Sequence, residues 1–325
     1  MNRRHALLRV VGLAACLASG GAALAQPLPP GPVKFVVGFA AGGSTDAMAR
    51  IIAEKLSERI GRSVFVENNA GASGRLAAEQ VKRAAPDGST VLVGNIGMIA
   101  LAPVTFRELS YHPLRDFQPV VRAVDFQLVV AAGAATGATD LSGFLRWLSD
   151  NPDKANLAVP LQASLSHLTA LRFAEAAGTK TTMVIYRGTA PAMQDILGGR
   201  LAGGVAAVGD FIEQHRAGTM RIVGVSGTRR APSLPDVPTF SEGGLKGLEG
   251  NGWNGFLLPS GAPSEVVEFL NREIAAVVAS PEVARKLDQL GFIPSEPNSP
   301  AQFAASIQSE MDAWRPIVKA SGLEQ

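Results

Sequence analysis

The sequence has few of the residues on which covalent and metal chemistry depend. Cys16 is the only cysteine among 325 residues, and only four residues are histidines. If Cys16 is removed with a leader peptide, disulfides, cysteine zinc sites and thiol catalysis are excluded together. The histidine and acidic residues show no paired spacing typical of a metal site. We therefore expect no metal, no cofactor and no catalytic residues.

A strong net charge is also missing. The chain has 30 Lys and Arg against 28 Asp and Glu, a formal net charge of +2. This balance provides no basic surface excess, so we expect no nucleic-acid partner. The chain also lacks a long apolar run that would make a convincing membrane span. Aromatic residues make up 6% of the chain and charged residues 18%, whereas hydrophobic residues make up 46%. A high hydrophobic fraction with few charges favours well-packed α/β domains over disorder.

The first 25 residues have the pattern of a secretory signal peptide. Basic Arg3, Arg4 and Arg9 precede or flank an Ala-rich apolar run that ends in an A-x-A site at Ala25. Cleavage there leaves 27 Lys and Arg against 28 Asp and Glu, so the mature charge is 27 − 28 = −1. Both Sec and Tat export fit the twin arginines. Lipoprotein processing at Cys16 is the minor alternative.

Hydrophobic periodicity predicts two α/β units. We assign residues 1–25 to the signal peptide, 26–124 and 228–325 to domain 1, and 125–227 to domain 2. The C-terminal helices either return to domain 1 or span both domains. Expected strands are 33–39, 63–67, 90–94, 120–131, 155–159, 182–186, 203–208 and 221–225, and expected helices are 45–60, 73–85, 141–149, 166–177, 190–197, 264–279, 280–290 and 301–320.

The stretch at residues 38–46, Gly-Phe-Ala-Ala-Gly-Gly-Ser-Thr-Asp, joins a buried strand to a helix. Bare backbone N–H groups at such a helix N-terminus favour a carboxylate or phosphate. The alternative is a tight turn whose Ser, Thr and Asp side chains cap the helix. The stretch matches neither G-x-G-x-x-G nor G-x-x-x-x-G-K-[ST], which disfavours nucleotide binding. Loops 68–73 and 95–98 should share the same sheet edge, where α/β proteins bind ligands.

Several segments in order resemble the extracytoplasmic solute receptors of tripartite tricarboxylate transporters, the Bug-type proteins. They cover nearly all of the chain after the leader, and together they form a specific pattern. The segments are 38–46 (GFAAGGSTD), 66–68 (VEN), 85–88 (APDG), 116–120 (DFQPV), 186–192 (YRGTAPA), 197–199 (LGG), 234–239 (LPDVPT), 242–244 (EGG) and 253–255 (WNG).

This resemblance implies an α/β fold with two domains, a type II-like Venus flytrap in which each domain has a mostly parallel sheet flanked by helices. It implies a monomer in the periplasm that captures a small organic carboxylate in the interdomain cleft and delivers it to the membrane permease subunits of a tripartite tricarboxylate-type transporter. The alternative is an envelope sensor that presents its closed form to a membrane receptor or kinase. Neither function is enzymatic.

The resemblance also implies two facing loops that bind the carboxylate, largely through backbone N–H groups. The family pattern Pro-Phe-Ala-Pro-Gly-Gly has lost its prolines here, to Gly38 and Ala41. In the second loop, Val159 replaces the first serine of the family pattern, and Leu161 and Ala163 replace its glycines. This change predicts a ligand that is smaller, more apolar or differently held than in typical members, or a copy that binds nothing tightly. The expected ligand-binding residues are Phe39, Ala40, Gly42, Gly43, Ser44, Thr45, Asp46, Gly97, Met98, Gln162, Ser164 and His167.

Ser164 and His167 need a separate interpretation, because serine and histidine together can form a nucleophile and its base. No orienting acid stands at a recognisable spacing, and no oxyanion motif accompanies them. We therefore do not expect a hydrolase. For His167 we favour a ring that bonds the loop backbone over direct ligand contact.

Overall fold

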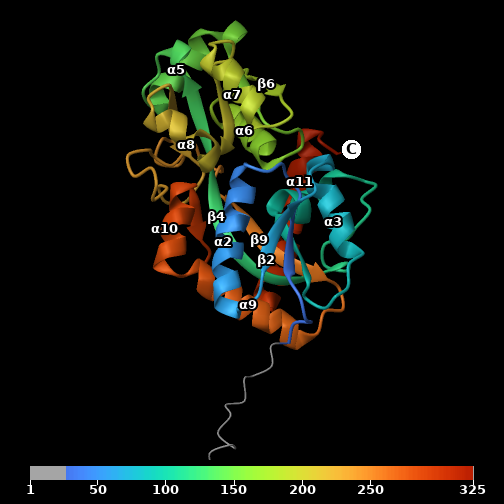
Figure 1. Ribbon diagram of the computed structural model, residues 1–325. Helices are drawn as coiled ribbons and strands as arrows, with labels where there is room; N and C mark the ends of the chain where they lie inside the picture. Colours follow the sequence, from blue (N-terminus) through green and yellow to red (C-terminus); the bar gives the residue numbers. More distant parts are fainter. Residues whose placement is uncertain (1–26, 325) are drawn as a thin grey trace, which may run out of the picture.

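The structure, a computed structural model, describes residues 27–324 and shows two lobes joined by long strands (Figure 1). The predicted leader and Cys16 lie outside the described residues. One continuous sheet runs through both lobes in the order β2-β1-β3-β9-β4-β7-β5-β6, with β10 and β8 also paired to β4. The α/β class is confirmed, and the sheet is mixed because β9, β10, β7 and β8 form antiparallel pairs.

The lower lobe begins with three parallel strands and the helices between them. These are β1 (Val33–Val37), α2 (Ser44–Ile60), β2 (Val64–Asn68), η1 (Ala72–Gly74), α3 (Arg75–Lys82) and β3 (Thr90–Asn95), followed by the π-helical turn η2 (Gly97–Leu101) and α4 (Ala102–Thr105). Gly61 ends α2 in the left-handed conformation that terminates many helices. This segment matches the predicted alternation closely.

Two long antiparallel strands connect the lobes. β4 (Phe117–Gly133) runs from the lower lobe into the upper one, and β9 (Asn251–Pro259) returns beside it. Sequence periodicity did not predict β9 or the short β10 (Phe292–Pro294). The first residues of β9 pair with Phe126 and Gln127 in the middle of β4, so the two strands run side by side where the chain passes between the lobes. We call this strand pair the hinge.

The upper lobe repeats the α/β alternation (Figure 1). Its elements are η3 (Ala134–Thr136), α5 (Leu141–Asp150), η4 (Pro152–Lys154), β5 (Asn156–Val159), α6 (Leu165–Ala176), β6 (Thr182–Ile185), α7 (Thr189–Leu197), β7 (Gly203–Ala207), α8 (Val208–Arg216) and β8 (Met220–Val225). Helix α8 was not predicted. The carboxyl ends of β5 and β7 lead into α6 and α8, at the side of this lobe that meets the lower one.

The C-terminal helices return to the lower lobe. They are α9 (Ser264–Val278), α10 (Pro281–Gln289) and α11 (Pro300–Ser321). Helix α9 packs against α2 through Val266 and Leu270 in one core cluster, and α11 contributes Phe303 to a second one. That second cluster also contains Leu168 of α6, so the upper lobe reaches into the lower core.

The upper lobe has two core clusters of its own, one on each face of its sheet. Leu234, Phe240 and Leu248 belong to these clusters. The domain division at residues 125 and 227 stays a prediction, and this packing favours a return to the lower lobe near residue 250 instead of 228.

Candidate functional site

The two lobes touch where the predicted first loop faces the start of α8. A Cβ atom added to Gly209 would overlap the carbonyl oxygen of Leu290 and lie 3.7 Å from Cβ of Ser44. Gly291 approaches from the other side, because a Cβ on it would lie 2.8 Å from the backbone nitrogen of Gly209. The glycines thus permit a close approach between α8 and the lower lobe, and residues 38–46 lie beside this contact.

The N-terminus of α2 offers open hydrogen-bond donors. Its N-cap is Gly43, and no side chain caps the helix among the described residues. The first backbone N–H groups of a helix have no partner within the helix, so those of Ser44 and Thr45 remain available to an anion. Of the capping alternative, only Asp46 makes a side-chain bond to the backbone at this helix start in the part of the chain that the structure describes, and it accepts from Gly42 just before the N-cap. Residues 40–43 are exposed, as a binding loop requires.

Asp46 holds this loop in shape. Its carboxylate is buried, with Oδ2 accepting from Gly42 N at 2.9 Å and Arg50 Nε at 3.0 Å, and Oδ1 accepting from Asn68 Nδ2 at 2.9 Å. Burial alone would raise its pKa, but the hydrogen bonds from Arg50, Gly42 and Asn68 outweigh it and hold the pKa below its ordinary value. These contacts give Asp46 a positioning role and occupy the Gly42 N–H.

The second glycine-rich loop supports the first one. A Cβ on Gly38 would lie 2.6 Å from Cα of Gly74, so the two loops pack backbone to backbone. Gly74 in turn leaves room for Met98, because a Cβ on it would lie 2.6 Å from Met98 Sδ. The Met98 side chain is buried in the core, and its carbonyl oxygen accepts from Tyr111 Oη at 2.6 Å. Met98 therefore supports the site from below, while the neighbouring Gly97 is partly exposed.

The upper-lobe loop is locked by its own side chains. Ser164 caps α6 by accepting from His167 N at 3.2 Å, and it donates to Leu161 O at 2.7 Å. His167 Nδ1 accepts from Ala163 N at 3.2 Å. Burial lowers the pKa of this imidazole, which favours the neutral ring that such an acceptor needs. The serine hydroxyl and the histidine ring thus serve the loop backbone and form no nucleophile–base pair, while Gln162 next to them is exposed.

Ala163 retains a backbone conformation that suits glycine. Its φ is +54°, in the left-handed region that costs a residue with a Cβ about 1–2 kcal/mol. Ala163→Gly is expected to raise the free energy of unfolding by about 0.5–1 kcal/mol, since glycine relieves the strain but orders a more flexible unfolded chain. Urea unfolding measures this change. Ala176→Gly at the end of α6 is the control and should lower stability; a loss of stability in both variants would contradict the strain at Ala163.

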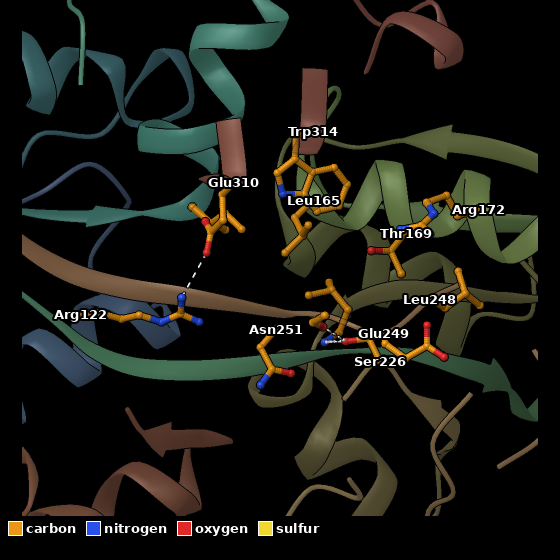
Figure 2. A pocket seen from close by; sticks show the side chains of 13 residues that line it. Arg122, Leu165, Thr169, Arg172, Ser226, Leu248, Glu249, Asn251, Glu310 and Trp314 are labelled. Atoms are coloured by element: carbon orange, nitrogen blue, oxygen red, sulfur yellow. Dashed lines mark hydrogen bonds and ion pairs between the residues drawn. The ribbon is translucent and has the colours of Figure 1, made fainter. Parts of the chain in front are cut away.

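A cavity of about 250 Å³ lies behind these loops at the hinge (Figure 2). Figure 2 shows Trp314 and Leu165 on one side of it, with Asn251 and Ser226 on the other. Arg122 donates to Glu310 Oε1 at 3.1 Å, and Trp253 Nε1 donates to Glu310 Oε2 at 2.6 Å. None of the twelve predicted site residues lines this cavity. It is therefore distinct from the predicted loops, although Ile96 and Leu165 border both regions.

Asp210 is a further ionisable group near the lobe contact, and the prediction of site residues did not include it. It lies in the first turn of α8, next to Gly209. Burial raises its pKa to about 6, although hydrogen bonds from Ala207 N–H and the Thr189 side chain favour the charged form. Asp210 is therefore positioned by α8, a helix that hydrophobic periodicity did not predict.

Two α/β lobes that are joined by hinge strands and meet at glycine-rich, donor-bearing loops define a two-lobed solute-binding protein. Residues 48–323 match the family described as tripartite tricarboxylate transporter family receptor, TctC, and the chain belongs to this family. These proteins are receptors rather than enzymes. No helix among residues 27–324 is long and apolar enough to cross a membrane, and no cluster of potential metal ligands occurs among them.

Solved structures of similar proteins agree with this assignment. The periplasmic binding protein BugD is 33% identical, with a TM-score of 0.82 over 91% of this chain and 99% of its own. MatC from Rhodopseudomonas palustris with bound malate is 31% identical, with a TM-score of 0.79 over 90% of this chain and 100% of its own. An R. palustris protein with adipate is 30% identical, with a TM-score of 0.84 over 90% and 98%.

Proposed function

We propose that this protein captures a small organic carboxylate between its lobes in the periplasm and delivers it to the permease of a tripartite tricarboxylate-type transporter. The observation that carries the proposal is the uncapped N-terminus of α2 beside the contact between the lobes. Its free backbone donors stabilise an anion without a buried counter-charge that would have to be desolvated. The malate and adipate bound to the two R. palustris proteins support the carboxylate class.

In this proposal the first loop makes the main contacts. The N–H groups of Gly43, Ser44 and Thr45 bind one carboxylate, and Asp46 holds the loop through Gly42. Phe39, Ala40 and Gly97 shape the adjoining surface, while Ser164 and His167 position the backbone of the opposite loop beside Gln162. Closure of the hinge then encloses the ligand, and the closed form is what the permease recognises.

A thermal-shift screen of mono-, di- and tricarboxylates and their amides tests the ligand class. A ligand that binds the folded protein raises its melting temperature by mass action. We expect at least one carboxylate to do so and its uncharged amide to fail. Flat curves for every carboxylate would contradict the proposal. Loss of uptake of that carboxylate in cells lacking this protein, with the permease present, tests the transport step; unchanged uptake would contradict it.

Binding should tighten as the pH falls, because Asp210 lies beside the closing contact. This prediction requires that contact with the lower lobe contributes to the burial that raises the Asp210 pKa from 3.8 to about 6, so that Asp210 takes up a proton as the lobes close. The closed form is therefore penalised above pH 6 and relieved below it. Between pH 7.5 and 5.5, affinity is expected to rise by about three- to fivefold.

Calorimetric titration of Asp210→Asn at the same two pH values is the control. This variant lacks the carboxyl group but keeps a similar shape, so any pH dependence that remains comes from protonation of the ligand itself. The difference between wild type and variant should account for the rise in affinity. Equal pH dependence in both proteins would show that Asp210 does not take up a proton on closure.

A further inference from the structure

Asn254 on strand β9 is a buried amide without a protein partner. Its exposed fraction is 1%, and neither Nδ2 nor Oδ1 has a hydrogen-bond partner within residues 27–324. A buried donor or acceptor left unpaired costs about 1–3 kcal/mol, so folded proteins rarely keep one without a reason. Asn254 leaves both kinds of group unpaired in one side chain.

The register of the sheet places this amide level with the start of the first loop, two strands away from β1. Asn254 of β9 pairs with Asn95 at the end of β3. Two residues earlier on β3, Val93 pairs with Phe256 of β9 on one side and with Val37, the last residue of β1, on the other. Phe39, two residues beyond Val37, therefore follows β1 at the level of Asn95 and Asn254. The loop of residues 38–46 begins at this level of the sheet.

Asn254 also lies on the face of the sheet that α2 covers. Side chains alternate along a strand, so Asn254 shares a face with Phe256, whose ring lies 4.8 Å from that of Phe35 in the cluster packed by α2. Trp253 points to the opposite face, toward Glu310 and the hinge cavity. The Asn254 amide therefore lies on the α2 side of the sheet, level with the start of the first loop, and on the other side of the sheet from the cavity of Figure 2.

We propose that Asn254 determines ligand specificity at the floor of this site and selects a carboxylate that also carries a hydroxyl group. Its Nδ2 donates to a ligand oxygen, and its Oδ1 accepts from the ligand hydroxyl. A carboxylate without a donor would leave Oδ1 buried and unpaired, because no protein group within residues 27–324 bonds it. This inference rests on the proposed function, because the ligand must first bind to the loop above.

Pairs of acids that differ by one hydroxyl group test the inference. Isothermal titration of the full mature chain would compare malate with succinate and 2-hydroxyadipate with adipate. We expect the hydroxy acid of at least one pair to bind about tenfold more tightly. Asn254→Leu, which has a similar volume and no polar atoms, should lose this preference within about twofold. It should also melt at the same temperature as the wild type or higher, because an unpaired amide has been removed.

Asn251→Leu is the matched control, because it changes an asparagine three residues earlier on the opposite face of β9, in the hinge cavity. In the wild type, Asn251 Oδ1 is also buried without a partner in the part of the chain that the structure describes. The preference of Asn251→Leu for the hydroxy acid should nevertheless equal that of the wild type. If Asn251→Leu loses the preference and Asn254→Leu keeps it, the ligand occupies the hinge cavity and the inference is wrong. If Asn254→Leu does not fold, Asn254→Ala replaces it.

The remaining outcomes separate this inference from the function on which it rests. If acids bind but no pair shows a preference, or if Asn254→Leu preserves the preference, the specificity role is wrong and the receptor function stands. A lower melting temperature with an unchanged preference would assign Asn254 a structural role instead. If no acid in the wider carboxylate screen binds, the proposed function itself fails and this inference falls with it.

Discussion

Replacing Gly209 with alanine is expected to weaken ligand binding by about a hundredfold while leaving both lobes folded. The added Cβ would overlap the carbonyl oxygen of Leu290, a backbone atom that cannot rotate away. The clash exists only where α8 meets the lower lobe, so opening the hinge relieves it. In the proposed function the ligand binds the closed form, so its apparent affinity should fall with the closed population.

Titration calorimetry and small-angle scattering measure these two consequences. Gly209→Ala should stay open in the presence of ligand, whereas the wild type becomes more compact. The control is Gly143→Ala, which lies in the first turn of α5 and whose Cβ would meet the Asp140 side chain at 3.3 Å. It should bind and close like the wild type. Full affinity in Gly209→Ala would show that ligand binding does not need the contact seen between the lobes.

Much of the fold is predictable because local periodicity is strong in the parallel α/β segments. Strand β9 escaped prediction because it contains glycines that normally weaken a strand. Side chains packed against β9 leave no room for a Cβ at these glycines. A Cβ on Gly252 would overlap the ring of Phe126, and one on Gly255 would lie 2.5 Å from the ring of Phe303. Its partner β4 lies more than a hundred residues earlier in the chain. Local sequence patterns predict neither the packing against these glycines nor the pairing of β9 with β4.

The first loop of the site was predictable because glycine pairs at a strand-to-helix turn have a direct physical meaning. Which residues of the site bind the ligand and which hold the loops in place could not be fully predicted from the sequence. Asp46 bonds the loop backbone at Gly42, and its position depends on further contacts with Arg50 and Asn68. In the opposite loop the expected bond of the His167 ring to the loop backbone is present, with Nδ1 accepting from Ala163 N. The importance of Asn254 depends on its register with β3, which the sequence of β9 does not reveal.

Asp46→Ala is expected to lower the free energy of unfolding by about 2–4 kcal/mol and to weaken ligand binding at least tenfold. The variant leaves the Gly42 N–H in the exposed loop and the half-buried Asn68 amide without the buried carboxylate that accepts from both. Asn68 also donates to Phe39 O at 3.1 Å, so its loss of order would loosen the start of the loop. Because the pKa of Asp46 is held low, the stabilisation is present above about pH 4 and is lost as the pH falls through the folded-state pKa.

Arg50→Ala separates the buried hydrogen bonds from the ion pair. The Arg50 side chain is 51% exposed, so solvent screening leaves its salt bridge with Asp46 only a small contribution to stability. Urea unfolding and calorimetric titration should therefore show a small loss for Arg50→Ala and a large one for Asp46→Ala in both stability and affinity. A stable Asp46→Ala protein that binds its carboxylate normally would mean that the first loop keeps its shape without this network, and that the anion is bound elsewhere or by a loop that orders only on binding.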